Sequence, residues 1–147
     1  HALPEKALKE QLAKSKSDLD DDSANMMAAF SMGRVGRAME FLNDPDHFRF
    51  YQDMYHQIAK FLDRSTVTDR MLYAEEVAKD PNSVSIFFEL FFHLLRGLML
   101  KKLEGEQISY RFEELFAMVE YLNQAQFELD HNVNPRMALE HLMMKFH

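Results

Sequence analysis

Apolar residues recur along this chain at the spacing of an α-helix. In the stretch 47–64, the positions that share one helical face are Phe48, Tyr51, Met54, Tyr55, Ile58, Phe61 and Leu62. In the stretch 109–131, the apolar residues lie mostly on one face: Phe112, Leu115, Phe116, Val119, Leu122, Phe127 and Leu129. No window shows the sustained apolar–polar alternation that is typical of a strand. The pattern therefore predicts an all-α fold.

Polar and proline-containing breaks divide this pattern into a series of predicted helices. They cover residues 5–14, 24–31, 35–43, 47–64, a segment from 65–68 to about 79, 84–103, 109–131 and 135–146. Ser, Thr, Asp and Asn favour the position before a helix, because their side-chain oxygens accept hydrogen bonds from its first amides. We expect such caps at Ser65-Thr66 or at Thr68, and at Ser109.

The clearest break in the first half is Asp44-Pro45-Asp46. Pro45 disfavours helix in the residue before it, and Asp46 can cap the helix that follows. We place a domain boundary here, which gives units of residues 1–44 and 45–147. The first unit is too small to be robust alone, so we expect it to lean on its neighbour or on a preceding domain.

Composition excludes several classes of site. The chain has no Cys, which excludes disulfides and thiolate metal sites and favours a reducing, cytoplasmic compartment. Its net charge of −7 argues against broad nucleic-acid binding, since phosphate contacts need concentrated Lys and Arg. The apolar stretch 84–100 approaches membrane-spanning length, but Glu89, His93 and Arg96 interrupt it. We expect the central buried helix of a soluble bundle and no membrane partner.

The sequence offers little support for metal binding or catalysis. No two of the seven His residues are three or four positions apart, and a helical ExxH pair occurs once, at Glu128–His131. A di-iron bundle needs two such pairs. The acidic cluster of Asp18, Asp20, Asp21 and Asp22 lacks the central Gly and late Glu of a Ca²⁺ loop, which favours a solvated helix cap. We expect no metal, cofactor or catalytic residue; a helical-bundle metal- or ligand-binding protein is the alternative.

Two loops carry more specific patterns. The segment Ser31–Ala38 contains Gly33, Gly36 and two Arg, so its amides and guanidinium groups could meet an anion at a helix N-terminus. The alternative is a helix–helix turn that glycine permits. Near the end of the chain, Asn134 can cap a helix and Pro135 suits its first position, where the missing N–H costs nothing.

Three segments together resemble the bacterial DNA polymerase III clamp loader, most closely its delta-prime subunits. SMGRVGRAMEFL, at 31–42, resembles the sensor-2 region in the small lid of AAA+ proteins. FFELFFHLLRGLMLKK, at 87–102, is similar to the family's collar helix, although many members have Asp where this chain has Gly97. The ending NVNPRMALEHLMM, at 132–144, is the most specific. Its motif residues are Asn132, Asn134, Pro135, Leu139 and Glu140.

The resemblance implies a C-terminal fragment that lacks the family's nucleotide-binding domain. Residues 1–44 would form a three-helix AAA+ lid, and residues 45–147 a helical-bundle collar that mediates oligomerisation. Arg37, with Gly33 and Gly36, matches the sensor-2 position, where an active ATPase contacts nucleotide phosphate. Delta-prime subunits generally do not hydrolyse ATP, so the resemblance implies that Arg37 is structural or vestigial and that this segment is not an enzyme.

The resemblance also implies partners. The collar would assemble with the gamma/tau ATPase and delta subunits into the ring that loads the sliding clamp onto primed DNA during replication. DNA would be contacted only through the assembled complex, part of a DNA polymerase holoenzyme with nucleotidyltransferase activity. Candidate interface residues are Phe88, Phe92, Arg96 and Tyr121. The C-terminal part of the gamma/tau ATPase is an alternative within the same family.

Overall fold

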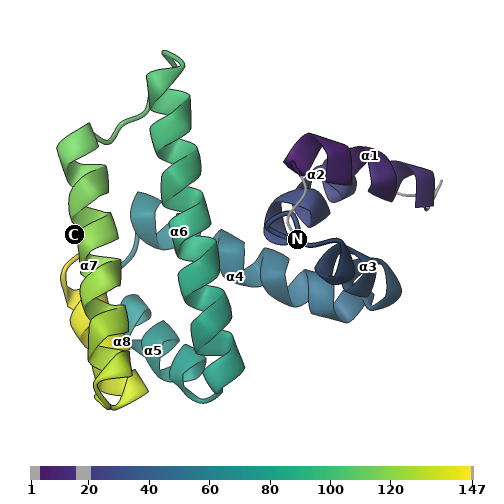
Figure 1. Ribbon diagram of the computed structural model, residues 1–147. Coiled ribbons are helices and arrows are strands. Elements are labelled where there is room, and N and C mark those ends of the chain that lie inside the picture. Colours follow the sequence, from purple (N-terminus) through teal and green to yellow (C-terminus); the bar gives the residue numbers. More distant parts are fainter. Residues whose placement is uncertain (1–3, 16–20, 147) are drawn as a thin grey trace. The chain divides into compact units, whose positions relative to one another are not determined.

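The computed structural model describes residues 4–15 and 21–146, of which residues 13–15 are described by their backbone alone. These residues form α-helices and no β-strand, which confirms the predicted all-α fold (Figure 1). The helices are α1 (Glu5–Ser15), α2 (Asp21–Phe30), α3 (Val35–Asn43), α4 (Pro45–Asp63), α5 (Val67–Ala78), α6 (Pro81–Leu103), α7 (Phe112–Asp130) and α8 (Pro135–Met144). The predicted acidic residues Asp18 and Asp20 lie outside the described part.

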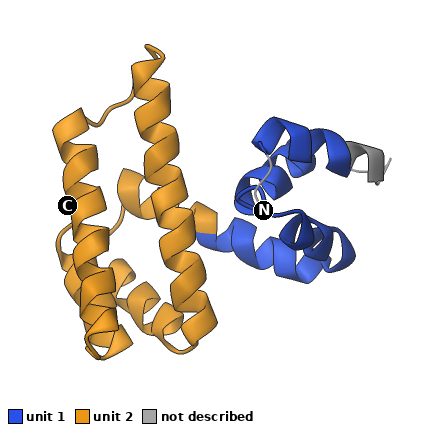
Figure 2. Ribbon diagram, viewed as in Figure 1, with its two compact units in different colours: residues 1–54 blue, residues 55–147 orange. Residues whose placement is uncertain are grey.

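The chain divides into two compact units, residues 1–54 and 55–147, and the division falls inside α4 (Figure 2). Pro45, where the sequence suggested a boundary, starts that helix. Asp44 is the residue that supports the start, because its Oδ1 accepts a hydrogen bond from the backbone N–H of His47 at 3.2 Å. The first part of α4 thus belongs to the first unit.

The first unit has an aromatic core. Phe41 of α3 lies 4.8 Å from the ring of Tyr51 and 5.4 Å from that of Phe48, both on α4. Phe30, at the end of α2, lies 6.2 Å from each of the same two rings. Edge-to-face and tilted aromatic pairs at these separations add to the free energy that burial supplies. One shared cluster therefore holds α2, α3 and the start of α4 together.

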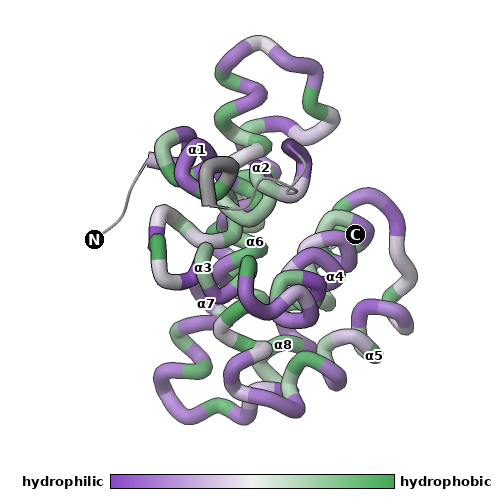
Figure 3. The backbone as a smooth tube through the Cα atoms, turned by 90° about the vertical axis from the view of Figure 1, so that its right-hand side faces the viewer, coloured by the Kyte–Doolittle hydropathy of each residue, from purple (hydrophilic) through white to green (hydrophobic). Residues whose placement is uncertain are grey.

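The second unit is built around α6. Phe87, Leu90, Phe91 and Leu95 of this helix are fully buried. α7 packs against α6 and α8, and α8 packs most extensively against α5 (Figure 1). Short groups of hydrophobic and hydrophilic residues follow one another along the helices of both units (Figure 3). This is the pattern of amphipathic helices that bury one face.

α6 is also the one helix of the described chain that is long and apolar enough to cross a membrane. The core helix of a soluble protein passes the same test of length and composition. Glu89 and Arg96 lie within α6, and its central residues supply the interior of the second unit. Of the apolar window of this helix, 33% is buried inside the described structure.

The helix starts of the second unit confirm one predicted cap and contradict another. Thr66 Oγ1 accepts from the Asp69 N–H at 3.0 Å and starts α5, so of the predicted alternatives the structure uses Thr66 and not Thr68. Asp80 Oδ1 accepts from the Asn82 N–H at 3.0 Å, so α6 begins at Pro81, before the predicted residue 84. The prediction that Ser109 caps α7 is wrong. That helix begins at Phe112, because the Glu114 carboxylate accepts from the backbone N–H of Arg111 at 3.1 Å.

A buried arginine connects α5, and the residues just before it, to the end of α8. Arg70 of α5 is 3% exposed. Its Nε donates to the carbonyl of Met143, in the last turn of α8, at 3.0 Å. Its Nη1 donates to the carbonyl and the hydroxyl of Ser65, at 3.2 and 2.9 Å. Since α-helices end with unpaired carbonyls, the guanidinium supplies a donor that α8 lacks.

We expect Arg70→Met to lower the free energy of unfolding by about 2–4 kcal/mol, because it leaves buried carbonyls without a donor. Arg70→Lys should also be destabilising, since an ammonium cannot reproduce the planar fork of a guanidinium. The exposed neighbour Arg64 gives the matched control, and Arg64→Met should change stability by less than about 0.5 kcal/mol. Urea unfolding followed by circular dichroism measures all three. Equal stabilities of the Arg70→Met and Arg64→Met variants would contradict this role.

Candidate functional site

The sensor-2-like segment forms a tight turn between α2 and α3. Met32 and Gly33 both have left-handed backbone conformations, with φ of 54° and 78°. The N–H of Arg34 then donates to the carbonyl of Ser31 at 3.0 Å. Gly33 is buried and occupies a conformation that glycine adopts without steric cost. The predicted glycine turn is therefore present at Gly33, whereas Gly36 lies on the exposed surface of α3.

Arg37 points into its own unit. Its Nη1 donates to the carbonyl of Phe30, the last residue of α2, at 3.5 Å. Its guanidinium carbon lies 5.9 Å from the centre of the Tyr51 ring, a cation–π contact. The charge thus sits at the negative end of α2, which favours cations. These contacts give Arg37 a structural role, and Arg34 is the exposed arginine of the segment.

The two glycines of this segment form a matched pair for substitution. Gly33→Ala should destabilise the first unit by roughly 1–2 kcal/mol, because a side chain in the left-handed region is strained. Gly36→Ala should be neutral or stabilising by up to about 1 kcal/mol, since a Cβ there meets no atom within 4 Å and alanine favours helix. Thermal unfolding of both variants checks the prediction. It is wrong if Gly36→Ala proves the more damaging change.

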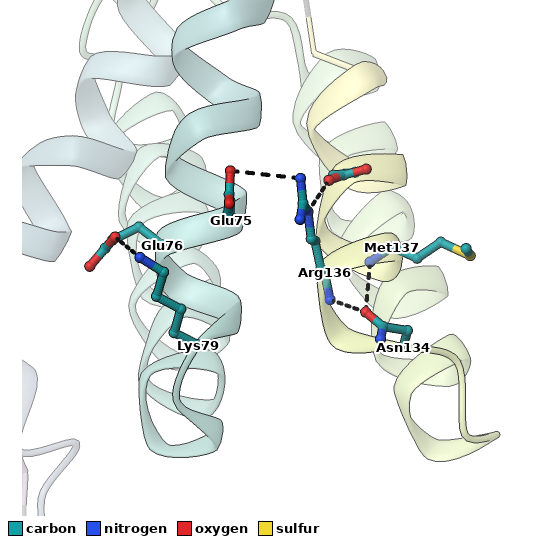
Figure 4. Close-up of polar contacts among 7 residues, drawn as sticks. Glu75, Glu76, Lys79, Asn134, Arg136 and Met137 are labelled. Atoms are coloured by element: carbon teal, nitrogen blue, oxygen red, sulfur yellow. Dashed lines mark hydrogen bonds and ion pairs between the residues drawn. The ribbon is translucent and has the colours of Figure 1, made fainter.

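The NVNP motif builds the turn between α7 and α8. The N–H of Val133 donates to the carbonyl of Glu128 at 2.9 Å, and Asn132 has φ of 65°. A residue with a left-handed backbone conformation commonly ends a helix, and Asn tolerates that conformation better than most residues. Asn134 Oδ1 then accepts from the N–H groups of Arg136 and Met137, at 2.9 and 3.4 Å (Figure 4). The predicted cap at Asn134 and the placement of Pro135 at the first turn of α8 are confirmed.

The remaining motif residues attach α8 to its neighbours. Leu139 is fully buried. Glu140 accepts from Arg136 Nε at 2.8 Å, and Arg136 Nη2 lies 3.7 Å from Glu75 Oε2 on α5 (Figure 4). The hydrogen bond to Glu140, with the charge of Glu75 adding to it, raises the pKa of Arg136. The side chains of Arg136 and Glu75 are exposed and that of Glu140 is half-buried, so these ion pairs contribute little to the stability of the fold.

Asn134→Ala should cost about 1 kcal/mol of stability, because the first amides of α8 lose their acceptor. Asn132→Gly is the control within the same turn, and it should stay within about 0.5 kcal/mol of the parent because glycine accepts positive φ. Urea titration of the two variants compares them directly. A larger loss for Asn132→Gly would show that its side chain, and not its backbone, matters.

The four candidate interface residues lie in different environments. Phe88 is 3% exposed, and its ring lies 5.6 Å from that of Phe87, so it contributes to the interior of the chain. Tyr121 is half-buried, with its ring 6.0 Å from that of Phe146. Phe92 is half-buried and Arg96 is exposed. Only Phe92 and Arg96 therefore belong to the accessible face of α6.

An exposed apolar surface continues this face toward the end of α6. Leu100 is 47% exposed and Leu103 is 71% exposed. With Phe92 and Arg96 they are spaced by four, four and three residues, which places them on one side of the helix. We call Phe92, Arg96, Leu100 and Leu103 the α6 stripe. The sequence alone does not single out the last two, because α6 is too apolar for its pattern to separate a buried face from an exposed one.

The described residues contain no group of three or more His, Asp or Glu side chains that could hold a metal ion. The ExxH pair does not converge. His131 Nδ1 lies 2.8 Å from the carbonyl of Phe127, and Glu128 Oε2 lies 3.5 Å from Nδ1 of His141. The geometry of this part of α7 is that of a helix end and its contact with α8.

Comparison of the chain with models of protein families, with curated proteins and with solved structures finds no match. The structure itself offers two kinds of feature. These are the structural motifs at the two loops and the exposed α6 stripe.

Proposed function

We propose that this chain is a non-catalytic scaffold part of a bacterial DNA polymerase III clamp loader, most similar to the delta-prime subunit. The proposal starts from the resemblance of three segments, at 31–42, 87–102 and 132–144. The all-α fold agrees with a small helical lid followed by a helical collar. The resemblance supplies the biological role, and the structure supplies surfaces on which that role can be tested.

The observation that supports an assembly role most directly is the α6 stripe. A stripe of aliphatic and aromatic side chains with one Arg has the composition found at the centre of protein interfaces. Isolated exposed Leu residues are ordinary, but adjacent ones on one helical face indicate a surface that is covered in an assembly. In this proposal the stripe contacts a neighbouring clamp-loader subunit, either the gamma/tau ATPase or delta.

The geometry of Arg37 supports the non-catalytic part of the proposal. Its guanidinium bonds the end of α2 and contacts Tyr51, so its contacts are those of a structural residue. In the proposed complex, ATP hydrolysis belongs to the gamma/tau subunits. This chain would contact DNA only through the assembled ring, in the cytoplasm.

The proposal is tested by co-purification with the cognate gamma/tau ATPase and delta subunits. The parent chain should be retained, and the Leu100→Glu/Leu103→Glu variant should bind one of these two subunits at least about tenfold more weakly, because it places charge in the core of an interface. Leu72→Glu is the matched control, since Leu72 is 61% exposed on α5, outside the stripe.

Circular dichroism of each variant should match the parent, which separates lost assembly from lost folding. Failure of the parent chain to bind either subunit would overturn the proposed function. Equal binding by the stripe variant and the parent would remove the stripe from the interface.

A further inference from the structure

A cavity of about 170 Å³ opens on the second unit, on elements other than the α6 stripe. One face of α7 lines it with Glu114, Ala117, Met118 and Tyr121, spaced by three, one and three residues. The remaining lining residues are Phe61, Leu62, Tyr110, Lys145 and Phe146. The walls are thus largely aromatic and apolar, and the volume suits one large side chain.

The polar groups at the cavity differ in whether they are already bonded. Glu114 is engaged, because Oε1 accepts from both the backbone N–H and Nε of Arg111, each at 3.1 Å. The hydroxyl of Tyr110 donates to the carbonyl of Leu62. Lys145 is different: its Nζ lies 5.4 Å from the centre of the Tyr121 ring, and no carboxylate among the described residues pairs with it.

This arrangement selects a type of occupant. An apolar side chain entering the cavity would contact Phe61, Met118 and Phe146, and a carboxylate beside it would meet the Lys145 ammonium. Burial raises the pKa of the Tyr110 hydroxyl, and the negative charges of Asp63 and Glu114 nearby raise it further. A carboxylate must therefore approach from the Lys145 side, which fixes the orientation of the occupant.

Ring assembly gives a reason for a second binding surface. A subunit in a head-to-tail ring contacts its two neighbours through two different surfaces, because such contacts are heterologous. The α6 stripe and the cavity share no residue. The stripe is an exposed helix face, whereas the cavity is concave and has a cation at its edge.

We infer that the cavity beside Lys145 receives an apolar side chain, with a carboxylate next to it, from one neighbouring clamp-loader subunit, while the α6 stripe contacts the other neighbour. This inference rests on the proposed function. Aromatic-lined pockets that take one anchoring side chain contribute much of the affinity of protein interfaces.

The first test measures the chemistry of the cavity in the isolated chain. Phenylacetate combines a ring with a carboxylate, and benzylamine combines a ring with an ammonium. Phenylacetate should shift the amide NMR signals of Ala117, Met118 and Tyr121, with a dissociation constant on the order of millimolar for so small a ligand. Benzylamine should shift them less. Lys145→Met should weaken phenylacetate binding roughly threefold to tenfold.

Lys79→Met is the control, because Lys79 is an exposed lysine of the second unit that pairs with Glu76. It should leave phenylacetate binding unchanged. Equal binding of the two ligands, no binding, or an equal effect of Lys145→Met and Lys79→Met would overturn the assignment of the cavity.

The second test uses the cognate gamma/tau and delta subunits separately. Ala117→Phe fills the cavity from within α7 and should abolish binding to one of the two subunits while keeping the other. Leu100→Glu/Leu103→Glu should show the opposite selectivity. Loss of both partners by a folded Ala117→Phe variant, or of neither, would overturn the inference and leave the proposed function standing. If the parent chain binds neither subunit, the proposed function fails and the docking role fails with it.

Discussion

The second unit depends on one buried guanidinium. Arg70 has no carboxylate partner among the described residues, and its hydrogen bonds go to the carbonyl of Met143 and to Ser65. A buried cation without a counter-ion is costly unless fixed dipoles replace water. The end of α8 supplies such a dipole, because its last carbonyls are unpaired and carry partial negative charge. The guanidinium thus donates to a carbonyl that would otherwise be unpaired, and that carbonyl replaces the water that burial removes from the cation. Both require that α8 ends beside the start of α5.

That contact links the local chemistry of the NVNP turn to the core. Asn134 and Pro135 set where α8 begins, and Arg70 bonds the place where it ends. The chain then continues to Phe146, whose ring stacks on that of Phe91 at 5.4 Å. Phe91 belongs to the buried face of α6, so Phe146 completes the interior around that helix. The NVNP turn, the Arg70 contact and the Phe146–Phe91 stack thus lie at successive points of the same C-terminal stretch.

Sequence reasoning succeeded where the cause of a structure is local. The caps at Thr66 and Asn134 follow from side chains two or three residues from the amides they bond. It failed at Ser109, because the Arg111–Glu114 pair competes for the same helix start. It could not foresee the burial of Arg70, whose acceptor lies 73 residues away. In α6 it could not tell that Phe88 is buried and Leu100 exposed. That helix has apolar residues on all of its faces, so their spacing does not indicate which face is buried.

Leu139 and Leu100 are both apolar, but only Leu139 is buried. Leu139 of α8, within the motif at 132–144, is fully buried, so the fold itself requires an apolar side chain there. Leu100 is 47% exposed on its helix, where a charged residue would serve the helix equally well. The fold therefore explains Leu139 and leaves Leu100 without a reason of its own. The motif at 132–144 therefore consists of residues that the fold itself uses, whereas the proposed contact with other subunits is assigned to side chains that the fold leaves exposed.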